Sequence, residues 1–340
     1  MGVVWATRAG SISHPGGGWE PPGNVPALAV PYRADRPKPG EARNLRAMQT
    51  APAPRRSCMS VPGSSAKMLA KAPTRGADEV VIDLEDAVAT SAKDDAREIV
   101  ITALAEPQWQ GVNCSVRVNA PRTPWCHTDI AALASLADGP ASLIVPKVES
   151  AGDLAFVERL LDGVEAACGA SRPMRVQALI ETAKGVSNVQ EIAAASPRLD
   201  ALILGYADLS ASVGRAAGAG APLDSWLAIQ DQILLAARTN DIAAIDGPYL
   251  GISVDAGFTA AAERARDMGF DGKWAIHPAQ VPALNALFTP TAEEVEHARA
   301  VIAALEEAER SGGAGAVALD GQMLDEAVRV AALRVLARAA

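Results

Sequence analysis

Acidic residues stand directly after several of the apolar runs in this sequence. Four of them carry the argument: Asp83, Glu85, Glu181 and Asp208. Carboxylate groups held close together repel one another unless a cation neutralises them. The sequence has only four histidines, and oxygen ligands favour Mg²⁺, with Mn²⁺ as a second choice, over Zn²⁺. If these runs end at one place in the fold, the sequence predicts a divalent metal site there.

Each of these acids also has a simpler interpretation. An acidic residue after a strand commonly caps the next helix, and Asp208 fits that role readily. Glu181, which abuts an apolar run and precedes Thr182, is a poorer cap and a better metal ligand. Arg117 could grip a substrate carboxylate with its planar guanidinium, but a salt bridge to the acids at 83–86 is the alternative. Taken singly, these residues leave the choice open.

A turn near the first apolar run could hold a phosphate. The segment Val61-Pro62-Gly63-Ser64-Ser65 opens a helical stretch, and Lys67 and Lys71 follow one turn apart. An ordinary capped helix with solvated lysines is the alternative. The sequence has no G-x-G-x-x-G after a strand, no Walker A motif and no G-x-S-x-G elbow, which argues against dehydrogenase, NTPase and serine-hydrolase chemistry.

Short apolar runs alternate with amphipathic segments through most of the chain. The runs predict strands at Ser57–Val61, Glu79–Asp83, Asn113–Val118, Ser142–Pro146, Arg175–Ile180, Ala201–Leu204, Ala243–Ile245 and Lys273–Ile276. Helical spacing lies between them at Ser64–Thr74, Ala92–Ala105, Thr128–Ala137, Gly152–Cys168, Gly185–Ala195, Leu223–Thr239 and Thr259–Met268. This repetition predicts an α/β fold, a TIM-type (β/α)8 barrel, with an open doubly wound sheet as the alternative. In a barrel, the acids named above would meet at one mouth.

The predicted organisation has three parts. Residues 1–54 are rich in glycine and proline and are expected to form a disordered tail, with Met48 as a candidate for the true start. Residues 55–289 are expected to form the barrel. Residues 290–340 are expected to form a C-terminal helical extension that acts as a lid. Its first helix, Thr291–Glu309, opens with a capping box, and its second covers about Asp325–Arg338.

Composition narrows the possible partners. Apolar residues make up 49% of the 340 residues and aromatic residues only 4%, which suits a core of small branched side chains between strands and helices. The formal net charge of -9 disfavours nucleic acid or an anionic membrane as a partner. No apolar run is long enough to span a bilayer, and the four scattered cysteines contain no C-x-x-C pair. We therefore expect a cytoplasmic protein with reduced thiols.

Several segments together resemble the citrate lyase β-subunit family, the CoA-ester lyase branch of the HpcH/HpaI aldolase superfamily. The resemblance covers about Arg56 to Arg334 and is carried by Ser60–Gly63, Val81–Val88, Val116–Asn119, Val145–Glu149, Ile180–Gly185, Gly205–Leu209, Gly269–Gln280 and Leu319–Asp325. It implies a TIM barrel that holds Mg²⁺ and breaks or makes a carbon–carbon bond in a CoA thioester.

The resemblance also implies roles for single residues at the mouth. Glu181 and Asp208 would hold the metal ion. Arg117 would grip the carboxylate of the substrate. Asp83 and Glu85 would support the water molecules of the metal and so contribute to the substrate site.

Two further features concern the CoA moiety and a second subunit. Lys67 and Lys71 would contact the CoA phosphates, although Ser64 and Ser65 stand where relatives often have basic residues. In lyases of this type the C-terminal segment commonly folds over the mouth of a neighbouring subunit and delivers a catalytic aspartate. Asp325 matches that position, and the glycines at 312, 313 and 315 would supply the hinge. The resemblance therefore implies a homo-oligomer, a trimer or a multiple of it.

We expect a reversible Claisen-type cleavage of a 3-hydroxyacyl-CoA into a keto acid and an acyl-CoA, with Asp325 moving the proton. The substrate could be of the citryl-, malyl-, methylmalyl- or citramalyl-CoA type, because pocket shape decides the acyl group. A malyl-CoA thioesterase and a metal-dependent aldolase without CoA are alternatives among enzymes. A non-catalytic CoA-ester-binding subunit is the alternative from another class.

Overall fold

The computed structural model describes residues 54–136, 139–216, 218, 222–311, 317–319 and 321–339. The expected tail, apart from Pro54, and the expected hinge glycines at 312, 313 and 315 lie outside these residues. Among the described residues, none of the helices is both long enough and apolar enough to cross a bilayer.

Within the described residues, eight parallel strands close into a barrel in chain order, and β8 pairs with β1. The strands are β1 Ser57–Pro62, β2 Glu79–Asp83, β3 Cys114–Arg117, β4 Ser142–Val145, β5 Arg175–Ile180, β6 Leu199–Leu204, β7 Ala243–Asp246 and β8 Gly272–Ala275. Each predicted strand overlaps one of these, so the predicted TIM barrel is confirmed and the open sheet is excluded. Runs of Val, Ile and Leu suit strands that are buried on both faces.

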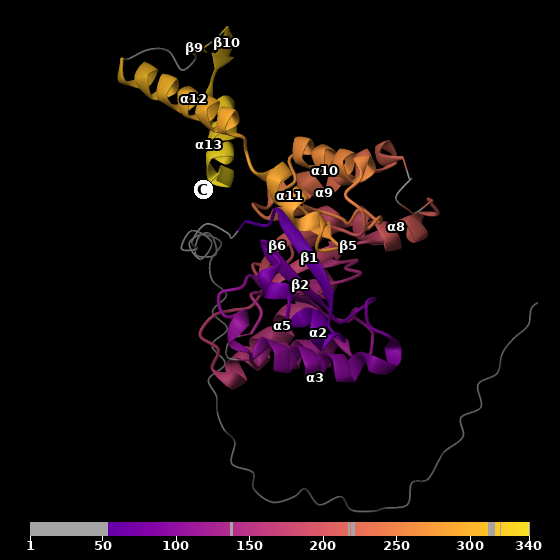
Figure 1. The fold of residues 1–340 in the computed structure, drawn as a ribbon. Helices are drawn as coiled ribbons and strands as arrows, with labels where there is room; N and C mark the ends of the chain where they lie inside the picture. Colours follow the sequence, from indigo (N-terminus) through magenta and orange to yellow (C-terminus); the bar gives the residue numbers. More distant parts are fainter. Residues whose placement is uncertain are drawn as a thin grey trace, which may run out of the picture. The chain divides into compact units, whose positions relative to one another are not determined.

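Helices surround this barrel (Figure 1). The α-helices are α2 Ala66–Leu69, α3 Lys93–Leu104, α4 Cys126–Ala134, α5 Ala151–Cys168, α6 Ala183–Ser187, α7 Val189–Ala193, α8 Tyr206–Val213, α9 Leu227–Thr239, α10 Ala256–Met268 and α11 Gln280–Phe288. Four short 3₁₀ segments accompany them in the described chain: η1 Ala72–Thr74, η2 Thr90–Ala92, η3 Pro107–Trp109 and η4 Leu223–Trp226.

The predictions about the helices were incomplete in several places, and the predicted helix Leu223–Thr239 is η4 followed by α9. The segment expected as one helix at Ser64–Thr74 is the short α2 followed by η1, because Pro73 lacks the N–H that a continuing helix needs. The segment Gly185–Ala195 is divided at Asn188 into α6 and α7. Helices α8 and α11 were not predicted. Pro282 lies in the first turn of α11, where proline is tolerated.

Two apolar layers hold the barrel together. The interior of the barrel is filled by side chains of small and medium size with one large ring: Cys58, Val81, Ile144, Leu179, Ala201, Ile203, Ile245 and Trp274. A larger layer packs the outer face of the strands against the helices. Because both layers are closely packed, the ends of the strands are fixed relative to one another.

The C-terminal extension has its own small core. It consists of α12 Ala292–Arg310, the hairpin of β9 Val317–Leu319 and β10 Gln322–Leu324, and α13 Glu326–Ala339. The predicted capping box at the start of α12 is present, with Thr291 and Glu294 each bonding the other's backbone N–H. The hairpin was not predicted. Asp325 immediately precedes α13.

Candidate active site at the barrel mouth

The carboxyl ends of strands β2 to β6 bring the predicted acids together at the barrel mouth. Asp83 ends β2, Arg117 ends β3, Lys147 follows β4, Glu181 follows β5 and Asp208 lies in the first turn of α8 after β6. Asp83 and Glu181 are almost fully buried, whereas the side chain of Asp208 is 39% exposed. The buried members can therefore act on a ligand only through this mouth.

Arg117 is held in place by Asp83. Its Nε and Nη2 donate to the two Asp83 carboxylate oxygens at 2.8 and 2.5 Å, and its Nη1 lies 3.1 Å from Glu85 Oε2. Asp83 also accepts from the backbone N–H groups of Glu85 and Ala87. The salt bridge that the sequence left as an alternative is therefore present, and Asp83 is saturated by four donors. The remaining N–H groups of Nη1 and Nη2 are what Arg117 can offer a substrate.

Lys147 lies at the centre of the cluster. Its Nζ donates to Glu85 Oε1 at 2.6 Å and lies 3.6 Å from both Asp86 and Asp208. Its backbone N–H donates to Glu181 Oε1 at 3.0 Å. The sequence placed Lys147 at the end of a strand without giving it a role. Its position among four acids depends on a turn with positive φ, which no local motif indicated.

Glu181 is the most strongly perturbed acid of the site. Burial, followed by the neighbouring charges of Glu85 and Asp208, raises its pKa to about 8. Burial likewise raises the pKa of Glu85. Such shifts are typical of carboxylates that function beside a cation or take part in proton transfer.

The residues present fit a hard divalent cation. Five carboxylates face only two cationic side chains, Arg117 and Lys147, so the cluster has a surplus of negative charge. Glu85 Oε2 is buried, and in the described chain it forms an ion pair with Arg117 Nη1 but accepts no hydrogen bond, so it can accept one from a metal-bound water. Among all the described residues, no three His, Cys, Asp or Glu side chains are arranged so that together they could hold a metal ion. Glu181 and Asp208 would therefore leave most coordination positions to water and substrate, as is usual for Mg²⁺.

Two buried basic residues support the loops of the mouth. Lys93 Nζ donates to the carbonyl oxygens of Leu84 and Glu85 at 2.9 and 2.6 Å, and so fixes the backbone that carries Glu85. Arg97 pairs with the fully buried Asp129, which in turn accepts from Asn119 just beyond Arg117. These residues were not predicted as functional, because their partners are distant in sequence or are backbone atoms.

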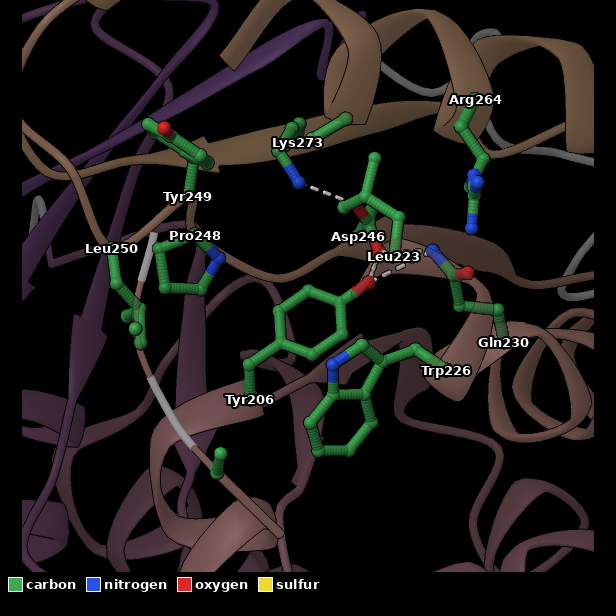
Figure 2. A pocket seen from close by; sticks show the side chains of 13 residues that line it. Tyr206, Leu223, Trp226, Gln230, Asp246, Pro248, Tyr249, Leu250, Arg264 and Lys273 are labelled. Atoms are coloured by element: carbon green, nitrogen blue, oxygen red, sulfur yellow. Dashed lines mark hydrogen bonds and ion pairs between the residues drawn. The ribbon is translucent and has the colours of Figure 1, made fainter. Parts of the chain in front are cut away.

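A side pocket adjoins the turn that carries Asp208. Figure 2 shows the phenol of Tyr206 and the amide of Gln230 pointing toward the carboxylate of Asp246, which also binds Lys273. Asp246 accepts from Tyr206 Oη and Lys273 Nζ, each at 2.5 Å, and from Gln230 Nε2 at 3.1 Å. The Asp246–Lys273 pair is 1% exposed on both sides. This network ties the first turn of α8 to β7 and β8.

The remaining predicted residues do not join the cluster. Lys67, in α2, and Lys71, just after it, are exposed, and neither forms an ion pair in the described chain. The start of α2 is capped by Ser65. Asp325 is exposed, and its carboxylate accepts from the Val328 N–H of its own helix. In the described part of this chain, no hydrogen bond or ion pair joins Asp325 to the mouth. Its predicted role therefore depends on a second copy.

The sequence of this chain is similar to those of known proteins. The family model for HpcH/HpaI aldolase/citrate lyase matches residues 56–278. The L-malyl-CoA/β-methylmalyl-CoA lyase of Rhodobacter capsulatus is 38% identical over 301 residues, which cover 83% of this chain and 94% of that protein. A (3S)-malyl-CoA thioesterase of Cereibacter sphaeroides is 38% identical over 290 residues, covering 84% and 95%.

A solved structure shows the same likeness. The protein CitE of Mycobacterium tuberculosis, crystallised with magnesium, acetoacetate and coenzyme A, superposes with a TM-score of 0.69. Its sequence is 33% identical, and the match covers 84% of this chain and 98% of that one. The family and the fold expected from the sequence are thus confirmed.

Proposed function

The chain belongs to the HpcH/HpaI aldolase/citrate lyase family and is a carbon–carbon lyase, and from that premise we propose that it reversibly cleaves a malyl-type 3-hydroxyacyl-CoA with Mg²⁺ as its metal. The observation that carries the proposal is that Glu181 and Asp208 both lie within 4 Å of one ammonium group, that of Lys147, with Arg117 fixed nearby by Asp83. The malyl type is favoured because the Rhodobacter capsulatus lyase matches most of the chain.

Each part of the cluster has a task in this reaction. Glu181 and Asp208 would hold the metal ion, with Mn²⁺ as a possible substitute. When bound, the ion would act as a Lewis acid on the hydroxyl or keto oxygen of the acyl group. Arg117 presents its remaining N–H groups to the acyl carboxylate, and Asp83 keeps the guanidinium in that orientation. Lys67 and Lys71, being solvated, can meet the phosphates of CoA.

In the proposed cleavage, the substrate alone supplies the atoms and electrons of both products. The bond between the carbinol carbon and the α-carbon of the thioester breaks, and the hydroxyl loses its proton to become the keto group of the released acid. The electron pair stays on the α-carbon of the thioester, which then takes up a proton. Asp325 from a neighbouring subunit is our candidate for that proton transfer. In the synthetic direction the same group removes the proton.

The C-terminal extension supports a homo-oligomer, which we propose to be a trimer or a multiple of it. Met323, Val330 and Leu333 are 74%, 41% and 51% exposed on β10 and α13. Apolar side chains so exposed are suited to packing against another copy. The cysteines are all free thiols, which agrees with a reducing, cytoplasmic location.

The experiment is a product analysis with purified protein and Mg²⁺. Malyl-, methylmalyl-, citramalyl- and citryl-CoA are offered separately, and keto acid and free thiol are followed independently. We expect keto acid without free thiol, fastest with a malyl-type ester. Glu181→Gln and Asp208→Asn should abolish turnover, whereas Glu149→Gln, which removes only a surface pair with Lys184, should not. Near-normal turnover in either ligand variant would contradict the proposal.

Hydrolysis is the second candidate, favoured by the identity to the Cereibacter sphaeroides thioesterase. A thioesterase could use the same metal site and differ only in admitting water to the thioester carbonyl. It would release free thiol together with the intact hydroxy acid. The two-product assay therefore separates the two activities in one measurement.

A further inference from the structure

Lys147 is the cation that both candidate metal ligands share. Its Nζ lies 3.9 Å from Glu181 Oε1 and 3.6 Å from Asp208 Oδ2. Among the described residues, no other lysine or arginine forms an ion pair with either acid. With its side chain 34% exposed, Lys147 can also be reached from the mouth.

The backbone of Lys147 is held in a conformation that costs energy. Its φ is 52°, in the left-handed region that residues other than glycine rarely adopt. In this conformation its N–H donates to Glu181 Oε1. Strain of this kind is kept where the surroundings require it, commonly at functional sites. The turn thus directs both the amide and the side chain of Lys147 to the mouth.

A bound dication and this ammonium group compete for the same space. Mg²⁺ binds carboxylate oxygens at about 2.1 Å, so an ion held by Glu181 and Asp208 would be close to any cation within 4 Å of both. Like charges at that separation repel strongly when they are shielded from water. The side chain has a second anchor, because its shortest contact is with Glu85 Oε1 at 2.6 Å.

We propose that Lys147 is a built-in counter-cation, which lies within 4 Å of both Glu181 and Asp208 in the metal-free protein and moves away from these two acids, while keeping its bond to Glu85, when the metal ion binds. This arrangement keeps the two carboxyl groups together before the ion arrives, and it lowers the affinity for the ion by competing with it. The inference rests on the metal site of the proposed function, but it concerns affinity for the ion and not turnover.

Mg²⁺ binding to the metal-free protein, without substrate, tests this directly. Titration calorimetry would compare wild type with Lys147→Met, which keeps the length of the side chain but not the charge, and Lys147→Arg, which keeps the charge. The matched control is Lys184→Met, because Lys184 is exposed and its one ion pair in the described chain is with Glu149. We expect Lys147→Met to bind Mg²⁺ at least tenfold more tightly, and the other two variants to stay within about threefold of wild type.

A second measurement uses the wild-type protein, so it does not depend on how well the variants fold. Lysines are acetylated with limiting reagent with and without Mg²⁺, and each site is quantified by mass spectrometry. We expect labelling of Lys147 to rise severalfold with Mg²⁺ and labelling of Lys184 to stay constant, because only Lys147 would lose contacts with two carboxylates.

The outcomes separate the two proposals. If wild type binds no Mg²⁺, the metal site itself is wrong. If wild type binds Mg²⁺ but Lys147→Met binds it equally or more weakly, Lys147 does not compete with the ion. Unchanged labelling of Lys147 would overturn the inference in the same way, whatever the variants show.

Discussion

Gly205, which directly follows β6 and precedes α8, lies against the carboxylate of Glu181. A Cβ at Gly205 would come within 2.6 Å of the Glu181 Cβ and 2.7 Å of its Oε2. The φ of Gly205 is -101°, which any residue can adopt, so the glycine provides space and not backbone freedom. The orientation of Glu181 therefore depends on the absence of a side chain at Gly205, directly after the neighbouring strand.

Gly205→Ala should weaken Mg²⁺ binding at least tenfold, because the added methyl group pushes Glu181 away from Asp208. Overpacking of this kind should also lower the free energy of unfolding by about 1–3 kcal/mol. Titration calorimetry and urea unfolding of the metal-free protein measure the two effects. The control is Gly163→Ala in α5, where a Cβ meets nothing within 4 Å. The control should keep its affinity and gain up to about 1 kcal/mol of stability.

The stability of the metal-free protein should fall as the pH rises toward 8. The pKa of Glu181 is raised from 4.5 to about 8, first by burial and then by Glu85 and Asp208, while Lys147 and Arg117 partly oppose the shift. The folded protein therefore holds a proton that the unfolded chain releases near pH 4.5. This contribution is complete below pH 4.5 and is lost as the pH passes 8, with a slope of at most about 1.4 kcal/mol per pH unit.

Urea unfolding in EDTA at several pH values between 5 and 9 measures this effect. Because other buried acids also titrate, the informative quantity is the difference between wild type and Glu181→Gln. The free energy of unfolding of Glu181→Gln should fall less steeply with rising pH than that of wild type. Glu98→Gln, which changes an exposed acid on α3, should follow wild type. Parallel curves for wild type and Glu181→Gln would show that Glu181 ionises normally.

The barrel was predictable because its signals are local. Each strand is a short apolar run, and the acids come directly after those runs, so Asp83, Glu181 and Asp208 could be placed at one mouth from the sequence alone. The capping box at Thr291 is also a local pattern, and it is present as predicted. Features that depend only on residues close together in the sequence were therefore predicted largely correctly.

The parts that sequence did not reveal depend on distant partners. Lys147 acquires its position from a positive φ and from acids on three other loops. Lys93 donates to backbone carbonyl oxygens. Every residue has such an oxygen, so the residue types do not indicate this contact. The commitment of Arg117 to Asp83 was foreseen only as an alternative to substrate binding, because a guanidinium suits either partner. Which partner Arg117 binds depends on the register between β2 and β3, and a single sequence does not show that register.

Tyr206→Phe tests whether the side pocket positions Asp208. The variant loses the hydrogen bond from Tyr206 Oη to Asp246, while Lys273 and Gln230 still bind Asp246. We expect a loss of about 1 kcal/mol in stability and, because the first turn of α8 loosens, a severalfold weaker affinity for Mg²⁺. Tyr249→Phe, in the loop after β7, is the control and should keep wild-type affinity. Equal affinities in both variants would restrict Tyr206 to a structural role.

Asp325 should act in the mouth of a neighbouring subunit. It is exposed, and in the described part of its own chain its carboxylate accepts a hydrogen bond only from its own helix. Asp325→Asn and Glu181→Gln should each be inactive alone, but co-assembled in equal amounts they should recover about a quarter of wild-type activity, because one random pairing in four joins both intact residues. Glu181→Gln mixed with Asp208→Asn should recover nothing, since both residues belong to the same mouth. If the first mixture also stays inactive although mixed oligomers are detected by mass spectrometry, Asp325 does not act between subunits.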